Sequence, residues 1–248
     1  MKYFFANWKM YLNVDQSVEL ANELAGQNIS ENCTVALFPS ALAFTGVRDA
    51  VSKTKINVGA QNCNWTPRGA YTGAISAELF AEAGAKFVLV GHSERRHIFG
   101  ETDTDVRKKI DAALDAGLIP VVCIGETQEE KENGRREYRL KKQLMKAFEG
   151  LVLDEDRKIM VAYEPIWAIG SGTPCLPADA DDVHGWIQNE LKQYTSATVP
   201  ILYGGSVDAK NVESYFATGT IDGVLVGSAS ADRVSCLAIL EAIASSNK

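Results

Sequence analysis

Eight short apolar runs constrain the fold of this chain more than any other feature. They occupy residues 3–8, 33–38, 56–60, 86–91, 119–124, 158–163, 200–203 and 221–226. Most of these runs lack polar alternation and are rich in β-branched residues, which is typical of strands buried on both faces of a parallel sheet. Because helical patterns fill the gaps, two architectures fit: a closed (β/α)₈ barrel and a doubly wound open sheet.

The residues after the first run favour one of these architectures. An open sheet that binds a dinucleotide carries a glycine-rich fingerprint there, whereas this chain has Asn7-Trp8-Lys9-Met10-Tyr11. Nucleotide binding is therefore disfavoured, and eight strands favour the barrel. With 248 residues, 46% hydrophobic composition and no Gly/Ser-rich linker, we expect one α/β TIM-barrel domain over residues 1–248.

Two helical patterns have recognisable ends. Residues 103–117 repeat an apolar side chain at every fourth position and finish in a glycine, which is typical of a helix stop. Thr127 and Glu130 have the spacing of a capping box and predict one long helix running toward Gly150. The charges of residues 129–136 have both signs, which indicates a solvated helix face.

Charge and hydropathy exclude several classes of partner. The formal net charge of −7 and a pI of about 5.1 argue against nucleic acid or an anionic membrane as the main partner. No run approaches 18 apolar residues, and the first residues do not resemble a secretory signal, so a cytoplasmic location is expected. An anionic small molecule remains a possible ligand, held by local donors.

The five cysteines predict no disulfide framework and no metal site. Their number is odd, no Cys-x-x-Cys pair occurs, and no histidine stands at ligand spacing. We expect reduced structural thiols at all five positions: Cys33, Cys63, Cys123, Cys175 and Cys236.

Glu164 is the first candidate for a reactive group. It follows the run 158–163, and Pro165 ends regular pairing there. Residues 166–169 are too apolar for an ordinary surface loop, and Gly170-Ser171-Gly172 follows them, which together resemble a lid that closes over a site. The pattern predicts a catalytic base, with a structural ion-paired carboxylate as the alternative.

Two further candidates lie after the first run. Asn7 and Lys9 are two residues apart, so in extended backbone both side chains point to one side and Trp8 to the other. Lys9 would then face the same strand ends as Glu164. The alternative is a surface lysine whose stem packs on Trp8.

His92 follows the fourth run and precedes a short helix that Ser93 is able to cap. Because a helix N-terminus disfavours imidazolium, His92 is expected to be neutral and to donate a hydrogen bond to a carbonyl oxygen. A structural histidine is the alternative. His97 and His184 lie in polar, helix-like surroundings and are interpreted as surface residues.

Two glycine-bearing turns follow the last two runs, Tyr203-Gly204-Gly205-Ser206 and Val226-Gly227-Ser228. Their backbone N–H groups are able to converge on a phosphate dianion, and loops at these positions form the usual phosphate site of a barrel. The alternative is that glycine serves only the geometry of the turns.

Together these segments closely resemble the triosephosphate isomerase family. The motifs that carry the resemblance are Asn7-Trp8-Lys9, Gln61-Asn62-Cys63, Gly69-Ala70-Tyr71-Thr72-Gly73, His92-Ser93-Glu94-Arg95-Arg96 and the segments 122–127, 163–170 and 203–206. The similarity runs essentially end to end.

The resemblance implies a reaction: interconversion of dihydroxyacetone phosphate and D-glyceraldehyde 3-phosphate through an enediol(ate), without metal or organic cofactor. Glu164 would move the proton and His92 would handle the oxygens, the established pairing in this enzyme family. Lys9 would offset substrate charge, and Asn7 would help to place the substrate.

The resemblance also assigns supporting residues. The phosphate donors would be Gly170, Ser206, Gly227 and Ser228. The lid and its apolar clamp would comprise Pro165, Trp167, Ile169 and Leu225. The dimer contacts would be Thr72 and Arg95. The loop of Thr72 would enter a neighbouring subunit and touch Asn7, so a homodimer is expected.

Two positions and one segment depart from the family pattern. Ser228 replaces a usual glycine, so a required positive φ would weaken phosphate binding. Ala74 replaces an acidic residue that pairs with Arg95 of the other subunit, which predicts a weaker dimer. The segment Thr173-Pro174-Cys175 differs at the second lid hinge.

Two rival interpretations fit these residues less well. Another phosphate-binding barrel with different acids and bases would share the last two loops, but it does not account for His92 or for Glu164 with its lid. A barrel retained as a weakly active or non-catalytic binding protein is motivated by Ser228 and Ala74, and it is kept as the alternative.

Overall fold

The structure is a computed structural model that describes residues 2–153, 157–169 and 174–245. Its eight strands are β1 (Lys2–Asn7), β2 (Cys33–Phe38), β3 (Asn57–Ala60), β4 (Phe87–Val90), β5 (Ile119–Ile124), β6 (Met160–Tyr163), β7 (Ile201–Tyr203) and β8 (Gly223–Val226). Each pairs in parallel with the next, and β8 pairs with β1, which closes the barrel. The predicted fold class is confirmed.

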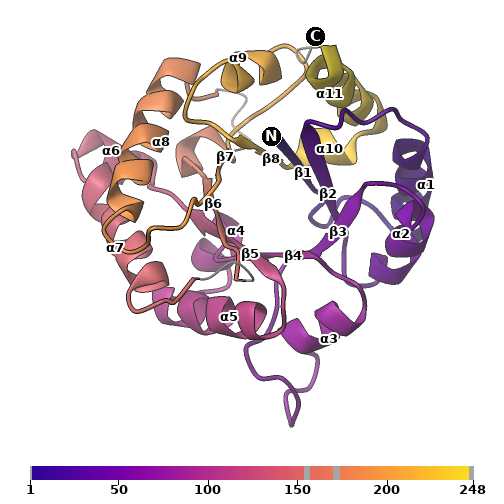
Figure 1. Cartoon of the computed structure of the whole chain (residues 1–248), viewed down its shortest axis with the longest axis horizontal. Helices are drawn as coiled ribbons and strands as arrows, with labels where there is room; N and C mark the ends of the chain where they lie inside the picture. Colours follow the sequence, from indigo (N-terminus) through magenta and orange to yellow (C-terminus); the bar gives the residue numbers. More distant parts are fainter. Residues whose placement is uncertain (1, 154–156, 170–173, 246–248) are drawn as a thin grey trace.

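Helices surround this barrel on the outside (Figure 1). They are α1 (Val14–Ala25), α2 (Phe44–Val51), α3 (Ala77–Glu82), α4 (Ser93–His97), α5 (Asp103–Asp115), α6 (Gln128–Glu132), α7 (Arg136–Phe148), α8 (Pro177–Leu191), α9 (Val212–Phe216), α10 (Ser228–Ala231) and α11 (Arg233–Ser245), with a 3₁₀ turn η1 (Ile166–Ala168). None of the described helices is long and apolar enough to cross a membrane.

Strands buried on both faces explain the unbroken apolar runs. In β1, Phe5 packs inside the barrel against the rings of Phe38 and Phe87, at centroid distances of 5.4 and 4.8 Å. Its neighbour Phe4 belongs to the layer between strands and helices. Both are fully buried. Side chains of alternate strand residues thus fill two cores, and hydrophobic burial stabilises both.

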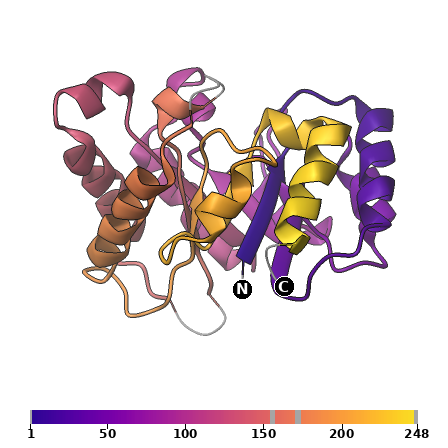
Figure 2. The ribbon, with the colours of Figure 1, turned by 90° about the horizontal axis from the view of Figure 1, so that it is seen from above.

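The strands set the two ends of the barrel apart. Figure 2 shows the start of β1 (indigo) and the end of α11 (yellow) at one end, with β1 running away from it. Because all eight strands are parallel, the residues that follow them gather at the opposite end. The candidate site residues follow strands and therefore lie there.

The expected long helix after Thr127 is wrong. Thr127 does cap a helix in a capping box with Glu130, but α6 ends after five residues and α7 begins at Arg136. Gly134 between them has φ of +66°, a left-handed conformation that glycine adopts without steric cost and that ends a helix.

His184 is also not where its sequence context placed it. It lies in α8, fully buried, with its ring edge-on to Tyr163 at 5.8 Å. Asp182 and Asn189 of α8 are exposed, whereas His184 packs against Tyr163 of β6. Burial lowers the pKa of its imidazole to about 3.

This burial makes stability depend on pH in a defined direction. The unfolded histidine has a pKa of about 6.5, so between that value and about 3 the unfolded chain binds the extra proton. Stability therefore falls as pH falls through this window, by up to ~1.4 kcal/mol per pH unit. In urea unfolding experiments, we expect the free energy of unfolding of His184→Gln to fall less steeply than that of wild type as the pH is lowered from about 6.5 to about 4. The control is His97→Gln at an exposed position; equal slopes in all three proteins would contradict this role.

Candidate active site

The sequence-predicted residues line one cavity at the carboxyl ends of the strands. Asn7 ends β1, His92 follows β4 by two residues, and Glu164 directly follows β6. The cavity has a volume of about 380 Å³. Among the predicted residues, those that line it are Asn7, Lys9, His92, Glu164, Ile169, Ser206, Leu225, Gly227 and Ser228.

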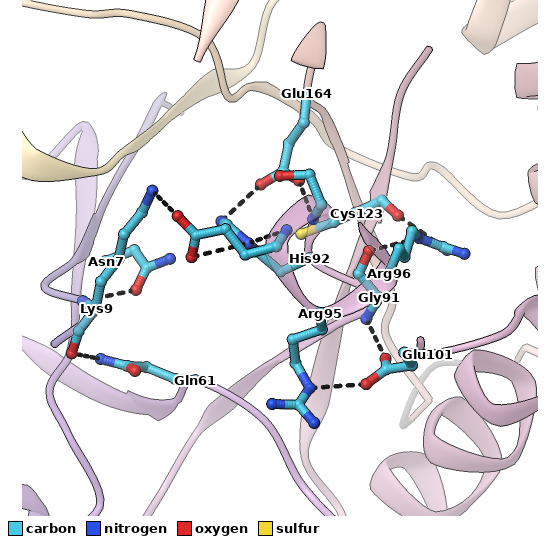
Figure 3. A network of polar contacts seen from close by, with 12 residues as sticks. Asn7, Lys9, Gln61, Gly91, His92, Arg95, Arg96, Glu101, Cys123 and Glu164 are labelled. Atoms are coloured by element: carbon cyan, nitrogen blue, oxygen red, sulfur yellow. Dashed lines mark hydrogen bonds and ion pairs between the residues drawn. The ribbon is translucent and has the colours of Figure 1, made fainter. Parts of the chain in front are cut away.

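Glu164 and His92 meet in a buried contact. The Glu164 side chain is almost wholly buried, and its Oε1 lies 3.1 Å from Nε2 of His92. Its Oε2 accepts a hydrogen bond from the backbone N–H of Ser93 at 2.9 Å. Figure 3 shows the carboxylate pointing at the imidazole, with Cys123 close to it. Both oxygens of this buried carboxylate therefore have a polar partner within the site.

Glycines make room for this carboxylate. A Cβ on Gly125 would lie 1.8 Å from the carbonyl oxygen of Glu164, and a Cβ on Gly204 would lie 2.9 Å from its Cγ. Neither position accepts a side chain without displacing Glu164. Gly204 thus has a packing reason beyond the geometry of its turn.

The hydrogen bonds of His92 define its tautomer. Nδ1 accepts from the backbone N–H of Glu94 at 3.3 Å, so the ring proton resides on Nε2. His92 is therefore itself the N-cap of α4, and the expectation that Ser93 caps this helix is wrong. The result is an Nε2–H donor aimed into the site, as the sequence analysis expected of a neutral histidine.

Lys9 is held in a strained backbone conformation. Its φ of +48° is the one left-handed value among the described non-glycine residues. Such a conformation costs of order 1–3 kcal/mol and persists only where neighbours fix it. Here Asn7 Oδ1 accepts from the Lys9 N–H at 3.1 Å, and Gln61 Nε2 donates to the Lys9 carbonyl at 2.8 Å.

With its backbone held by these contacts, Lys9 reaches Glu94 in the first turn of α4. Its Nζ lies 2.6 Å from Oε1 of Glu94 (Figure 3). Gln61 also donates to the Phe38 carbonyl at 2.9 Å, so one amide ties β1 to β2 beneath the lysine. Gln61 belongs to a motif of the sequence, but no role was predicted for it. Its position directly after β3, at the strand ends, is the feature that could have indicated a role in the site.

The phosphate loops are arranged differently from each other. Both donors of Ser206 are directed to the carbonyl of Ala168, the hydroxyl at 2.6 Å and the N–H at 3.1 Å. Ser228 is exposed and begins α10 without a left-handed φ. The backbone strain considered for a serine at this position is therefore absent.

The first part of the predicted lid packs on α6. The indole of Trp167 donates to Oε1 of Glu126 at 2.9 Å, and Nζ of Lys131 lies 3.4 Å from its ring centroid. Tyr163 donates to the same carboxylate oxygen at 3.1 Å. Burial raises the pKa of Glu126. The role of Glu126 in holding Trp167 was not predicted from the sequence, because the two residues are 41 positions apart in the chain.

The structure describes only some of the remaining residues of the predicted lid. Pro165 is buried, and Ile169 and Leu225 line the cavity as an apolar pair near Glu164. Gly170 and Thr173 lie outside the described residues. Pro174 lines the cavity from the other end of the segment.

The predicted dimer residues lie beside a larger cavity. Thr72 is exposed on the loop between β3 and α3, which projects from the barrel in Figure 1. Arg95 pairs with Oε2 of Glu101 at 2.7 Å within the chain, so it has an acceptor without an acid at position 74. A cavity of about 770 Å³ runs past Arg95 and Ala74 to Asn7.

Comparisons with known proteins agree with this geometry. The model of the triosephosphate isomerase family matches residues 2–243. The triosephosphate isomerases of Symbiobacterium thermophilum and Moorella thermoacetica are 39% and 40% identical over 244 and 237 residues, which cover 96% and 94% of this chain and 95% of each relative. That of Aquifex aeolicus is 41% identical over 231 residues, 92% of this chain and 93% of the relative. The chain belongs to the triosephosphate isomerase family.

The activity follows from this membership. The chain is an isomerase of glycolysis that interconverts triose phosphates, as its family does. The resemblance inferred from the motifs is confirmed, and the reading as a phosphate-binding barrel of another family is excluded.

Gln61→Met tests whether the hold on Lys9 matters for catalysis. Methionine has similar volume but no donor, so the Lys9 carbonyl loses the Gln61 amide and the Phe38 carbonyl keeps only the N–H of Trp8. We expect kcat/KM to fall about tenfold, the effect of losing one or two such bonds. Gln27→Met removes an exposed bond to Glu23 and should leave kcat/KM unchanged. A Gln61→Met enzyme within twofold of wild type would show that Lys9 holds its position without this amide.

Proposed function

We propose that Glu164, His92, Lys9 and Asn7 perform the interconversion of dihydroxyacetone phosphate and D-glyceraldehyde 3-phosphate, with no metal or organic cofactor. The observation that carries this proposal is the buried contact of 3.1 Å between Glu164 Oε1 and the Nε2–H of His92. Both residues line the same small cavity, which supports the assignment of a base and a hydrogen-bond donor to them.

Glu164 acts as the base in this proposal. It removes a proton from the carbon next to the carbonyl and returns it to the neighbouring carbon. Nε2–H of His92 donates to the oxygens as the enediol(ate) develops, the pairing established for this family. The substrate takes over the contacts that Glu164 makes with His92 and Ser93, so both donors are already oriented.

Lys9 supplies the positive charge that the substrate requires. The protein has a net charge of −7, so attraction of a dianion depends on local groups. The Lys9 ammonium lies at the cavity with Glu94 as its present partner. Asn7 fixes the backbone of Lys9 and lines the cavity beside it.

We place the phosphate at the loops after β7 and β8. Gly227 and Ser228 line the cavity at the start of α10, and their backbone N–H groups are the proposed donors, together with Ser206 and Gly170. A Cβ on Gly227 would lie 3.2 Å from Cε of Lys9, so glycine lets the lysine pass close to this loop. Ser206 would exchange its contact with Ala168 for the phosphate.

The lid and clamp exclude water from the reaction. Pro165 and Trp167 fix the start of the segment, while Ile169 and Leu225 line the cavity with apolar surface. This apolar cover displaces water from around Glu164. It also favours isomerisation over loss of phosphate from the enediolate.

A homodimer is proposed from the surface around the larger cavity. Met10, Ile98 and Phe99 are 94%, 71% and 68% exposed, an unusual grouping of large apolar side chains. The loop that carries Thr72 is a matching projection, and the cavity of about 770 Å³ reaches Asn7. A second copy would thus complete each site. Sedimentation equilibrium that finds only monomer at assay concentrations would contradict this arrangement.

The cytoplasm is the proposed location, because the family's reaction belongs to glycolysis.

Glu164→Gln tests the proposed base directly. Glutamine keeps the size of the side chain but cannot accept the proton, so kcat should fall by about 10³-fold or more in a coupled assay. Glu190→Gln, which changes another buried glutamate away from the cavity, should retain wild-type turnover. Turnover of Glu164→Gln within tenfold of wild type would rule out this base, and a folded but inactive wild type would favour a non-catalytic barrel.

A further inference from the structure

The far end of the lid segment is held by two tyrosines from separate elements. Cys175 is buried, and the residue before it, Pro174, lines the catalytic cavity. The backbone N–H of Cys175 donates to the hydroxyl of Tyr203 at 3.1 Å, and the Cys175 carbonyl accepts from the hydroxyl of Tyr215 at 2.6 Å. Both polar groups of one residue are therefore fixed from the barrel side.

The two tyrosines form one rigid unit. Tyr203 ends β7 and Tyr215 lies in α9, and their rings stack with centroids 4.3 Å apart and planes at 23°. Both side chains are almost wholly buried. Together the two phenols contact both backbone polar groups of Cys175.

The same unit adjoins the phosphate loop. A Cβ on Gly205 would lie 2.1 Å from the hydroxyl oxygen of Tyr203, so this glycine admits the phenol. Asn211, at the start of α9, donates to the carbonyl of Ser206 at 3.3 Å. Helix α9 thus contacts both Cys175 and the loop that begins at Gly204.

We propose that Tyr215 is a positioning residue for the isomerisation: its hydroxyl fixes Cys175 so that Pro174 stays against the cavity and excludes water from it. The phenol does not touch the reacting atoms and acts through Cys175. This inference rests on the function proposed above, since the cavity matters for turnover only if the reaction occurs there.

Tyr215→Phe separates the hydroxyl from the ring. The stack on Tyr203 remains, but the Cys175 carbonyl loses its donor. We expect kcat/KM to fall about tenfold, the effect of one buried hydrogen bond. The inorganic phosphate released per isomerisation should rise severalfold, because water enters the cavity. Hydrogen exchange at the Cys175 amide should also become faster.

Tyr194→Phe is the matched control. It removes one tyrosine hydroxyl bond, to Glu190 at 2.9 Å, far from the cavity. It should leave kcat/KM, phosphate release and exchange at Cys175 as in wild type. A Tyr215→Phe enzyme with lowered Tm but unchanged kcat/KM and phosphate release would overturn the proposal and leave a purely structural bond.

Hydrogen exchange keeps the two proposals distinguishable. If wild type does not isomerise triose phosphates, the proposed function fails, whereas unprotected exchange at Cys175 in wild type defeats the role of Tyr215 alone. Faster exchange in Tyr215→Phe together with raised phosphate release supports the positioning role.

Discussion

The contact between Glu164 and His92 is the interaction on which the rest of the site depends. The two residues follow β6 and β4, which lie on either side of β5, and their side chains meet at 3.1 Å beyond the strand ends. A flat sheet edge would leave them on a line without enclosure. The barrel instead surrounds them with strand ends and buries the carboxylate, while Gly125 and Gly204 leave space for the backbone carbonyl and the Cγ of Glu164.

Several weak or costly features are organised around this contact. Lys9 adopts a left-handed backbone that its own residue type disfavours, and Asn7 and Gln61 compensate with three hydrogen bonds to the neighbouring backbone. Glu126 is buried and accepts from Tyr163 and Trp167, which fixes the start of the lid segment. Orienting these polar groups at one end of the barrel costs free energy of folding, and burial of apolar side chains in the two cores offsets that cost.

Much of the fold followed from the sequence because the strands are buried on both faces, which leaves unbroken apolar runs such as that around Phe4 and Phe5. The positions of Asn7, His92 and Glu164 followed from where those runs end. Features set by local backbone or by distant contacts did not follow. The break between α6 and α7 depends on the left-handed φ of Gly134. The burial of His184 depends on which face of α8 meets the barrel. The hydrogen bond of Tyr215 depends on a carbonyl 40 residues away in the chain.

The tautomer of His92 tests the account most directly, because it decides what the imidazole offers to Glu164 and to a substrate oxygen. We would record ¹⁵N NMR spectra of the histidine rings at neutral pH and assign His92 from its loss in His92→Gln. A protonated, pyrrole-like Nε2 and an acceptor Nδ1 are the predicted result. An imidazolium, or a proton on Nδ1 with an unprotonated Nε2, would contradict the proposed geometry of the site.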